Sequence, residues 1–112
     1  MKTLKGLIIG LALVVQNCTT ADNNFIQIID SPDNFQGKEI EVSGVMHERF
    51  EDVAIYLTDD NNTEKAIWVD FKKYKDGLDG QRIRLKGEFD KTDKGHLGQY
   101  LGTIKDAEII VD

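Results

Sequence analysis

This sequence of 112 residues has little of several residue types that define whole classes of protein. Its single cysteine excludes an internal disulfide framework, and two histidines beside that cysteine leave no His/Cys cluster for zinc. One proline and 40% hydrophobic residues are typical of a small folded domain and not of a disordered tail. We therefore expect one globular domain, with no metal or other cofactor.

Basic residues are also scarce, with 14 Lys and Arg against 20 Asp and Glu. Residues 1–17 contain two of the lysines and no acid, so the remaining chain has 12 basic against 20 acidic residues and a net charge of −8. A surface this acidic repels phosphate backbones. This argues against nucleic acid as a partner, unless the three lysines among residues 72–75 converge with Lys91 and Lys94 on one side of the fold.

The N-terminus has the outline of a secretory signal peptide, a short basic segment followed by the apolar run 6–15. This run is about half of the ~20 residues that a helix needs to cross a bilayer. Cys18 follows just beyond it. That position resembles a bacterial lipoprotein signal, in which the cysteine is lipidated and becomes the mature N-terminus. The resemblance implies an exported membrane lipoprotein that contacts the membrane through its lipid anchor only, facing the periplasm or the exterior.

A second cleavage position, after Ala21, competes with cleavage just before Cys18. Asn17 stands where the usual lipoprotein signal has a small residue, and Thr19-Thr20-Ala21 offers small residues that an ordinary signal peptidase reads. Cleavage there would give a soluble periplasmic or secreted protein. Under the lipoprotein interpretation, residues 1–17 are the signal peptide, 18–24 a polar tether and 25–112 the folded domain.

Short alternating segments, separated by clusters of Gly, Asp and Asn, dominate the chain after residue 38 and predict β-strands. Upstream, residues 25–29 form either an extra strand or one turn of helix. Residues 72–78 are the only other place for a helix, which would then link the third and fourth strands. The five expected strands are 39–46, 53–58, 66–71, 82–89 and 107–111.

An internal repeat gives the best topological clue, because residues 34–44 match residues 77–87 position for position. Each copy has an apolar residue, a turn glycine, an alternating strand and a closing glycine. We expect the two strands to pair, with Gly44 and Gly87 at bends or bulges. Pairing would place opposite charges across from each other, worth roughly 0.2–1 kcal/mol per pair, with Glu39 and Glu41 on one strand and Arg82 and Arg84 on the other.

Five strands, glycine bends in the first and fourth, and a short helical link predict an all-β, antiparallel OB-fold barrel. Residues 35–111 resemble the small bacterial OB-fold domains of envelope proteins, grouped with the tRNA-anticodon-like OB superfamily. The segment Gly87-Glu88-Phe89-Asp90-Lys91 is similar to the one that ends the fourth strand in the periplasmic bacterial OB-fold family. The resemblance implies a binding module, and OB domains bind oligonucleotides, sugars and proteins alike.

Four aromatic side chains form the candidate ligand site. Alternation places Tyr56 and Trp68 on the strand face opposite the aliphatic residues, either as an open stacking platform, as core, or beneath residues 25–29. His96 and Tyr100 lie in the glycine-bearing segment 95–102. This segment is either a hairpin whose two side chains bond to backbone and close the barrel, or a loop that contacts ligand.

No motif in the sequence assembles a catalytic site. His47 is expected to be an exposed loop histidine that follows the first strand. The favoured function is therefore non-catalytic binding of an envelope protein, a saccharide or a small ligand. The alternatives are a nucleic-acid-binding OB domain and a small exported enzyme with His47 or His96 as general base.

Overall fold

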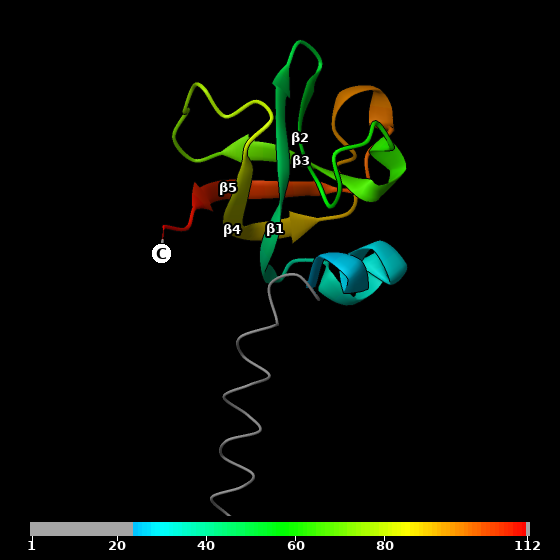
Figure 1. Cartoon of the computed structure of the whole chain (residues 1–112). Coiled ribbons are helices and arrows are strands. Elements are labelled where there is room, and N and C mark those ends of the chain that lie inside the picture. Colours follow the sequence, from blue (N-terminus) through cyan, green and yellow to red (C-terminus); the bar gives the residue numbers. More distant parts are fainter. Residues whose placement is uncertain (1–23, 112) are drawn as a thin grey trace, which may run out of the picture.

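The computed structural model describes residues 24–111, in which five β-strands form a closed barrel (Figure 1). Neighbouring strands follow the order β1-β2-β3-β5-β4, and β4 pairs with β1 to close the barrel. All five expected strands are present, although β1 runs on beyond residue 46 and β5 begins before residue 107. The strands are β1 (Glu39–Arg49), β2 (Asp52–Tyr56), β3 (Ala66–Phe71), β4 (Arg82–Asp90) and β5 (Thr103–Ile109).

Alternation of apolar and polar residues positions the strands around one core. In β1, Ile40 and Val42 are buried while Glu39 and Glu41 are exposed. Burial of each such aliphatic side chain contributes about 1.5–3 kcal/mol. Every strand supplies at least one side chain to this interior.

Residues 24–30 are helical, so of the two expectations for this segment the helix is confirmed. Phe25 and Ile28, three residues apart on one helix face, are completely buried and join the barrel core. The short 3₁₀ segment η1 (Pro32–Phe35) then leads into β1. Two further 3₁₀ turns, η2 (Thr63–Lys65) and η3 (His96–Gly98), lie in the loops that precede β3 and β5.

The predicted pairing of the two repeat strands is confirmed, since β1 and β4 are antiparallel neighbours. The charges do not align as expected, because Arg82 lies opposite Val45 and Arg84 lies opposite Ser43. Antiparallel pairing reverses one strand, so equivalent positions of the two repeats do not face each other. Lys86 is the residue that lies opposite Glu41.

The expectation of a wholly antiparallel barrel is wrong, because β3 and β5 are parallel. The reason is topological. Strand direction cannot alternate all the way around a closed ring with an odd number of strands, so at least one neighbouring pair must be parallel. In this chain the parallel pair joins Trp68 to Thr103 and Val69 to Ile104.

The expected helical link between the third and fourth strands is also absent, since residues 72–78 contain no helix. Gly77 and Gly80, with φ angles of 82° and 79°, adopt the left-handed conformation that interrupts a helix. Lys72 and Lys75, three residues apart, would also repel each other on one face of a helix. The short helix of this domain therefore precedes the barrel and does not connect β3 to β4.

The closing glycines of the repeats lie at the corners of the barrel. At Gly87 the register between β4 and β5 shifts, which confirms the expected bulge. A Cβ atom at this position would lie 2.5 Å from Ile104 Cγ2, so only glycine fits. Gly44 lies just before Val45, the residue at which β1 pairs with both β4 and β2.

Candidate functional site

Tyr56 and Trp68 share the outer face of β2 and β3, as alternation predicts, while Ile55 and Ile67 face the core. They do not form an open platform. Tyr56 is only 1% exposed and Trp68 is half-buried. Tyr100, from the loop between β4 and β5, and His47, from β1, pack on this face, and residues 25–29 do not.

The structure brings all four candidate site residues together in one aromatic cluster. The Trp68 ring meets the edge of the Tyr100 ring at a centroid distance of 5.2 Å, and it stacks on His96 at 6.5 Å. Gly95, with φ of 69°, allows this approach, since a Cβ there would lie 2.8 Å from Trp68 Cβ. The β4–β5 loop therefore lies directly on the outer face of β3.

The expected position of His47 in an exposed loop is wrong. This residue belongs to β1 and is completely buried, so the expectation of an exposed loop histidine is contradicted. Its Nδ1 lies 2.9 Å from Asp52 Oδ2 and its Nε2 lies 3.2 Å from Asp59 Oδ1. Its ring also packs on Tyr56, with centroids 4.0 Å apart.

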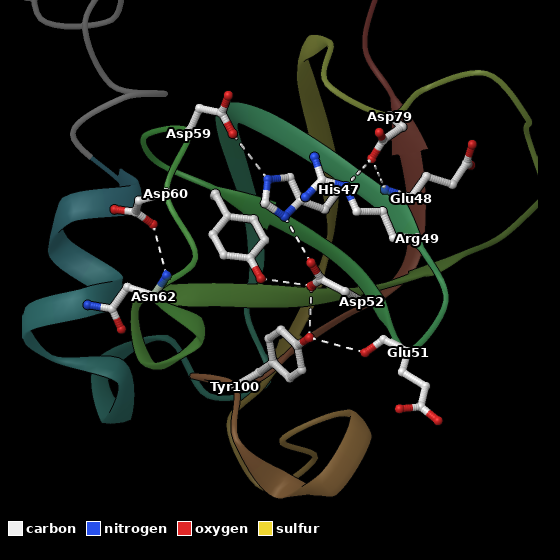
Figure 2. A network of polar contacts seen from close by, with 11 residues as sticks. His47, Glu48, Arg49, Glu51, Asp52, Asp59, Asp60, Asn62, Asp79 and Tyr100 are labelled. Atoms are coloured by element: carbon white, nitrogen blue, oxygen red, sulfur yellow. Dashed lines mark hydrogen bonds and ion pairs between the residues drawn. The ribbon is translucent and has the colours of Figure 1, made fainter.

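Asp52 is the centre of this polar network (Figure 2). Its Oδ1 accepts hydrogen bonds from Tyr56 at 2.7 Å and from Tyr100 at 2.8 Å, and its Oδ2 faces His47. Burial raises the pKa of Asp52, but the hydrogen bonds from Tyr56, His47 and Tyr100 outweigh burial, and the net pKa lies below its ordinary value. Asp52 is therefore an ionised acceptor with three donors.

The pKa values of the two tyrosines shift in the opposite direction to that of Asp52. Burial, followed by the hydrogen bond to ionised Asp52, raises the pKa of Tyr56 well above its ordinary range. The same two causes raise the pKa of Tyr100 to about 12. Both hydroxyls are therefore neutral donors at physiological pH.

This arrangement ties separate elements of the barrel together. His47 is fully buried, and its two ring nitrogens face the carboxylates of Asp52 and Asp59. Tyr100 connects the β4–β5 loop to the turn between β1 and β2 through Asp52 and, at 3.4 Å, through the Glu51 carbonyl. We call this set (His47, Asp52, Tyr56, Asp59 and Tyr100) the Asp52 network.

A signal for the Asp52 network was present in the sequence. Asp52, Ala54 and Tyr56 alternate onto one face of β2, and the register of the β1–β2 hairpin places His47 opposite Ala54. The residues between the strands, Phe50 and Glu51, form a two-residue turn that fixes this register. A two-residue turn at this point places His47 between Asp52 and Tyr56.

Two large apolar side chains project from the loops that this network joins. Phe50, in the β1–β2 turn, is 92% exposed, and Leu97, in the β4–β5 loop, is 81% exposed. Glu51 and His96, the neighbours of these residues, contact each other at 3.2 Å. We call Phe50, Leu97 and the exposed parts of Trp68 and His96 the apolar rim.

The lysines considered for nucleic-acid binding do not all converge. The three among residues 72–75 line one groove with Tyr74. Lys91 instead pairs with Asp33, and Lys94 lines a different hollow beside Thr63.

Within residues 24–111, no three or more His, Cys, Asp or Glu side chains gather as a metal site. The same part of the chain contains no helix that is both long and apolar enough to cross a membrane. Cys18 and the expected signal peptide lie outside the described residues. Comparison with protein-family models, with curated proteins and with solved structures gave no match.

Proposed function

We propose that this chain is an exported, non-catalytic binding module with an OB-type barrel, held at a bacterial membrane by a lipid on Cys18. The strand order β1-β2-β3-β5-β4 in a closed five-stranded barrel supports the OB assignment. The basic and apolar segments before Cys18 support export. The burial of His47 between Asp52 and Asp59 supports binding without catalysis.

The partner in this proposal is another envelope protein, which docks on the apolar rim. The observation that carries the proposal is the high exposure of Phe50 and Leu97 on two loops that are fixed to each other. Exposed large apolar residues that gather on one surface mark interaction sites. Contacts through Glu51 and Tyr100 hold the loops in place, so little conformational entropy is lost when a partner binds.

A protein fits this surface better than a saccharide or a nucleic acid. Sugars and bases stack on open aromatic faces. Here Tyr56 is buried, and Gly95 and His96 lie against Trp68. The acidic Glu51 and the net charge of −6 further disfavour a phosphate backbone at the rim.

Site-specific photo-crosslinking in cells that make the protein tests this proposal. A photoreactive amino acid replaces Phe50 or Leu97, and Lys38, exposed near the start of β1, is the control position. We expect one protein to be captured from both rim positions and not from the control. The purified partner should then bind Phe50→Ser/Leu97→Ser at least about tenfold more weakly than wild type, a loss of about 1.4 kcal/mol. Identical capture from all three positions would contradict the proposal.

A further inference from the structure

A second surface lies away from the apolar rim, where the chain leaves β3 and passes the end of β5. There a groove of about 750 Å³ has an apolar base that includes Phe71, Ala107 and Ile109. Tyr74 and Val111 line it while remaining 77% and 86% exposed. A volume of this size is within the roughly 300–1,000 Å³ of typical ligand sites.

The charge of this groove is opposite to that of the whole chain. Lys72, Lys73 and Lys75 line it, and Glu108 is its single acidic lining residue. Glu108 lies 3.6 Å from the Lys72 ammonium and so is already paired. Lys73 and Lys75 make no ion pair with any other residue in the described range. In a protein with net charge −6, two available ammonium groups beside an apolar base favour a ligand that is both acidic and apolar.

The backbone beside the groove is also available. Lys72 N–H bonds to the Ala107 carbonyl, but residues 73–75 make no backbone hydrogen bonds within the described part of the chain. An extended peptide can pair with such free N–H and C=O groups while its alternate side chains enter a groove.

We propose that this groove binds a short, extended, acidic segment of a partner protein, with its carboxylates on Lys73 and Lys75 and its apolar side chains beside Tyr74. A long polyanion or an anionic membrane is disfavoured, because the chain as a whole has a net charge of −6. A short peptide brings only the charge that the groove neutralises. This site shares no residue with the apolar rim and does not depend on the function proposed for it.

Binding of defined peptides to the full chain in non-ionic detergent tests this inference. The probe is a fluorescent peptide that alternates glutamate and leucine over eight residues, compared with the same peptide carrying glutamine. Lys73→Glu/Lys75→Glu removes both available cations. Lys38→Glu/Lys65→Glu, at two exposed lysines elsewhere, is the control with the same change in net charge. Lys73→Gln/Lys75→Gln serves as a milder second variant, and thermal unfolding checks that each variant is folded.

We expect saturable binding of the acidic peptide, with at least about tenfold loss in Lys73→Glu/Lys75→Glu and no more than about twofold loss in the control pair. The glutamine peptide should bind more weakly, and Phe50→Ser/Leu97→Ser should bind the acidic peptide as wild type does. No binding of the acidic peptide below about 1 mM would overturn the inference. Equal loss in the two lysine pairs would also overturn it, as would tighter binding to oligothymidine or to phosphatidylglycerol vesicles than to the peptide.

Discussion

The loop between β3 and β4 and the loop between β4 and β5 differ in how they are bonded to the barrel, although both contain aromatic and charged residues. Figure 1 shows them on different flanks of the barrel, with residues 91–102 leading to β5 and residues 72–81 leading to β4. The β4–β5 loop is fixed: Leu101 N–H bonds to the Ala66 carbonyl, and the Tyr100 hydroxyl bonds to Asp52. The β3–β4 loop is fixed near its end, where Gly80 N–H bonds to the Met46 carbonyl, while residues 73–75 have no backbone partner among residues 24–111.

The difference teaches what a loop needs in order to become part of the barrel surface. Tyr100 is an amphipathic anchor, since its ring packs in the aromatic cluster while its hydroxyl reaches a buried acceptor. Tyr74 is also an aromatic residue in a loop, yet it is 77% exposed. Anchoring thus leaves one loop as a rigid support for the apolar rim, and its absence leaves the lysines of the other loop available.

Removal of the central carboxylate should have the largest effect on the fixed loop. Asp52→Ala leaves two buried tyrosine hydroxyls and His47 without their shared acceptor, and we expect it to lower the free energy of unfolding by about 2–3 kcal/mol. Urea denaturation measures this change. Glu64→Ala, at an exposed acid, is the control and should stay within about 0.5 kcal/mol of wild type. Equal effects of the two substitutions would mean that the Asp52 network does not stabilise the fold.

Glycine substitutions should distinguish the two loops by their contacts. Gly95→Ala adds a Cβ that would overlap Trp68 at a φ of 69°, so we expect a loss of about 1–3 kcal/mol. Gly77→Ala has the backbone strain alone, because a Cβ at its φ of 82° would have no atom within 4 Å. Thermal unfolding should therefore rank Gly95→Ala below Gly77→Ala in stability, and a reversed order would contradict the packing of the β4–β5 loop on β3.

Acid should weaken the Asp52 network in a defined pH range. The folded-state pKa of Asp52 lies below its ordinary value of 3.8, so its contribution is fully present above that value and is lost as pH falls through the lower one. The stability difference between wild type and Asp52→Ala should be constant from about pH 7 to 5 and shrink below about pH 4. Urea titrations at a series of pH values give this difference. A difference that grew on acidification would have the wrong sign for this account.

The smallest effect is expected in the second loop. Lys73→Gln/Lys75→Gln changes two lysines that make no ion pair in the described range, so the free energy of unfolding should stay within about 0.5 kcal/mol of wild type. Urea denaturation beside Lys38→Gln/Lys65→Gln provides the comparison. A larger loss in the 73 and 75 pair would show that these side chains serve the fold and are not held available for a ligand.

Much of the barrel could be predicted from local pattern. Alternation predicted the five strands and put Tyr56 and Trp68 on the same outer face, and the repeat predicted that β1 and β4 pair. These features depend on residues close in sequence or on two similar segments. They are the part of the structure in which local preference and fold agree.

What could not be predicted depends on how distant segments meet. The hairpin register places His47 against Asp52, and Asp59 reaches it from the loop between β2 and β3. Asp52 and Tyr100 are 48 residues apart. Nothing in the composition of residues 95–102 shows that Tyr100 finds a carboxylate in another loop. Likewise, the parallel β3–β5 pair follows from closure of the ring and not from either strand alone.

Amide hydrogen exchange of the full chain tests most directly whether one loop is fixed to the barrel and the other is not. The account predicts slow exchange at Leu101 and Tyr100, whose N–H groups bond to the carbonyls of Ala66 and Lys94, and fast exchange at residues 73–75. In Asp52→Ala, protection at Tyr100 and Leu101 should fall more than protection in the barrel strands. Fast exchange of both loops in the wild-type chain, or protection at Tyr100 that is unchanged in Asp52→Ala, would contradict the account.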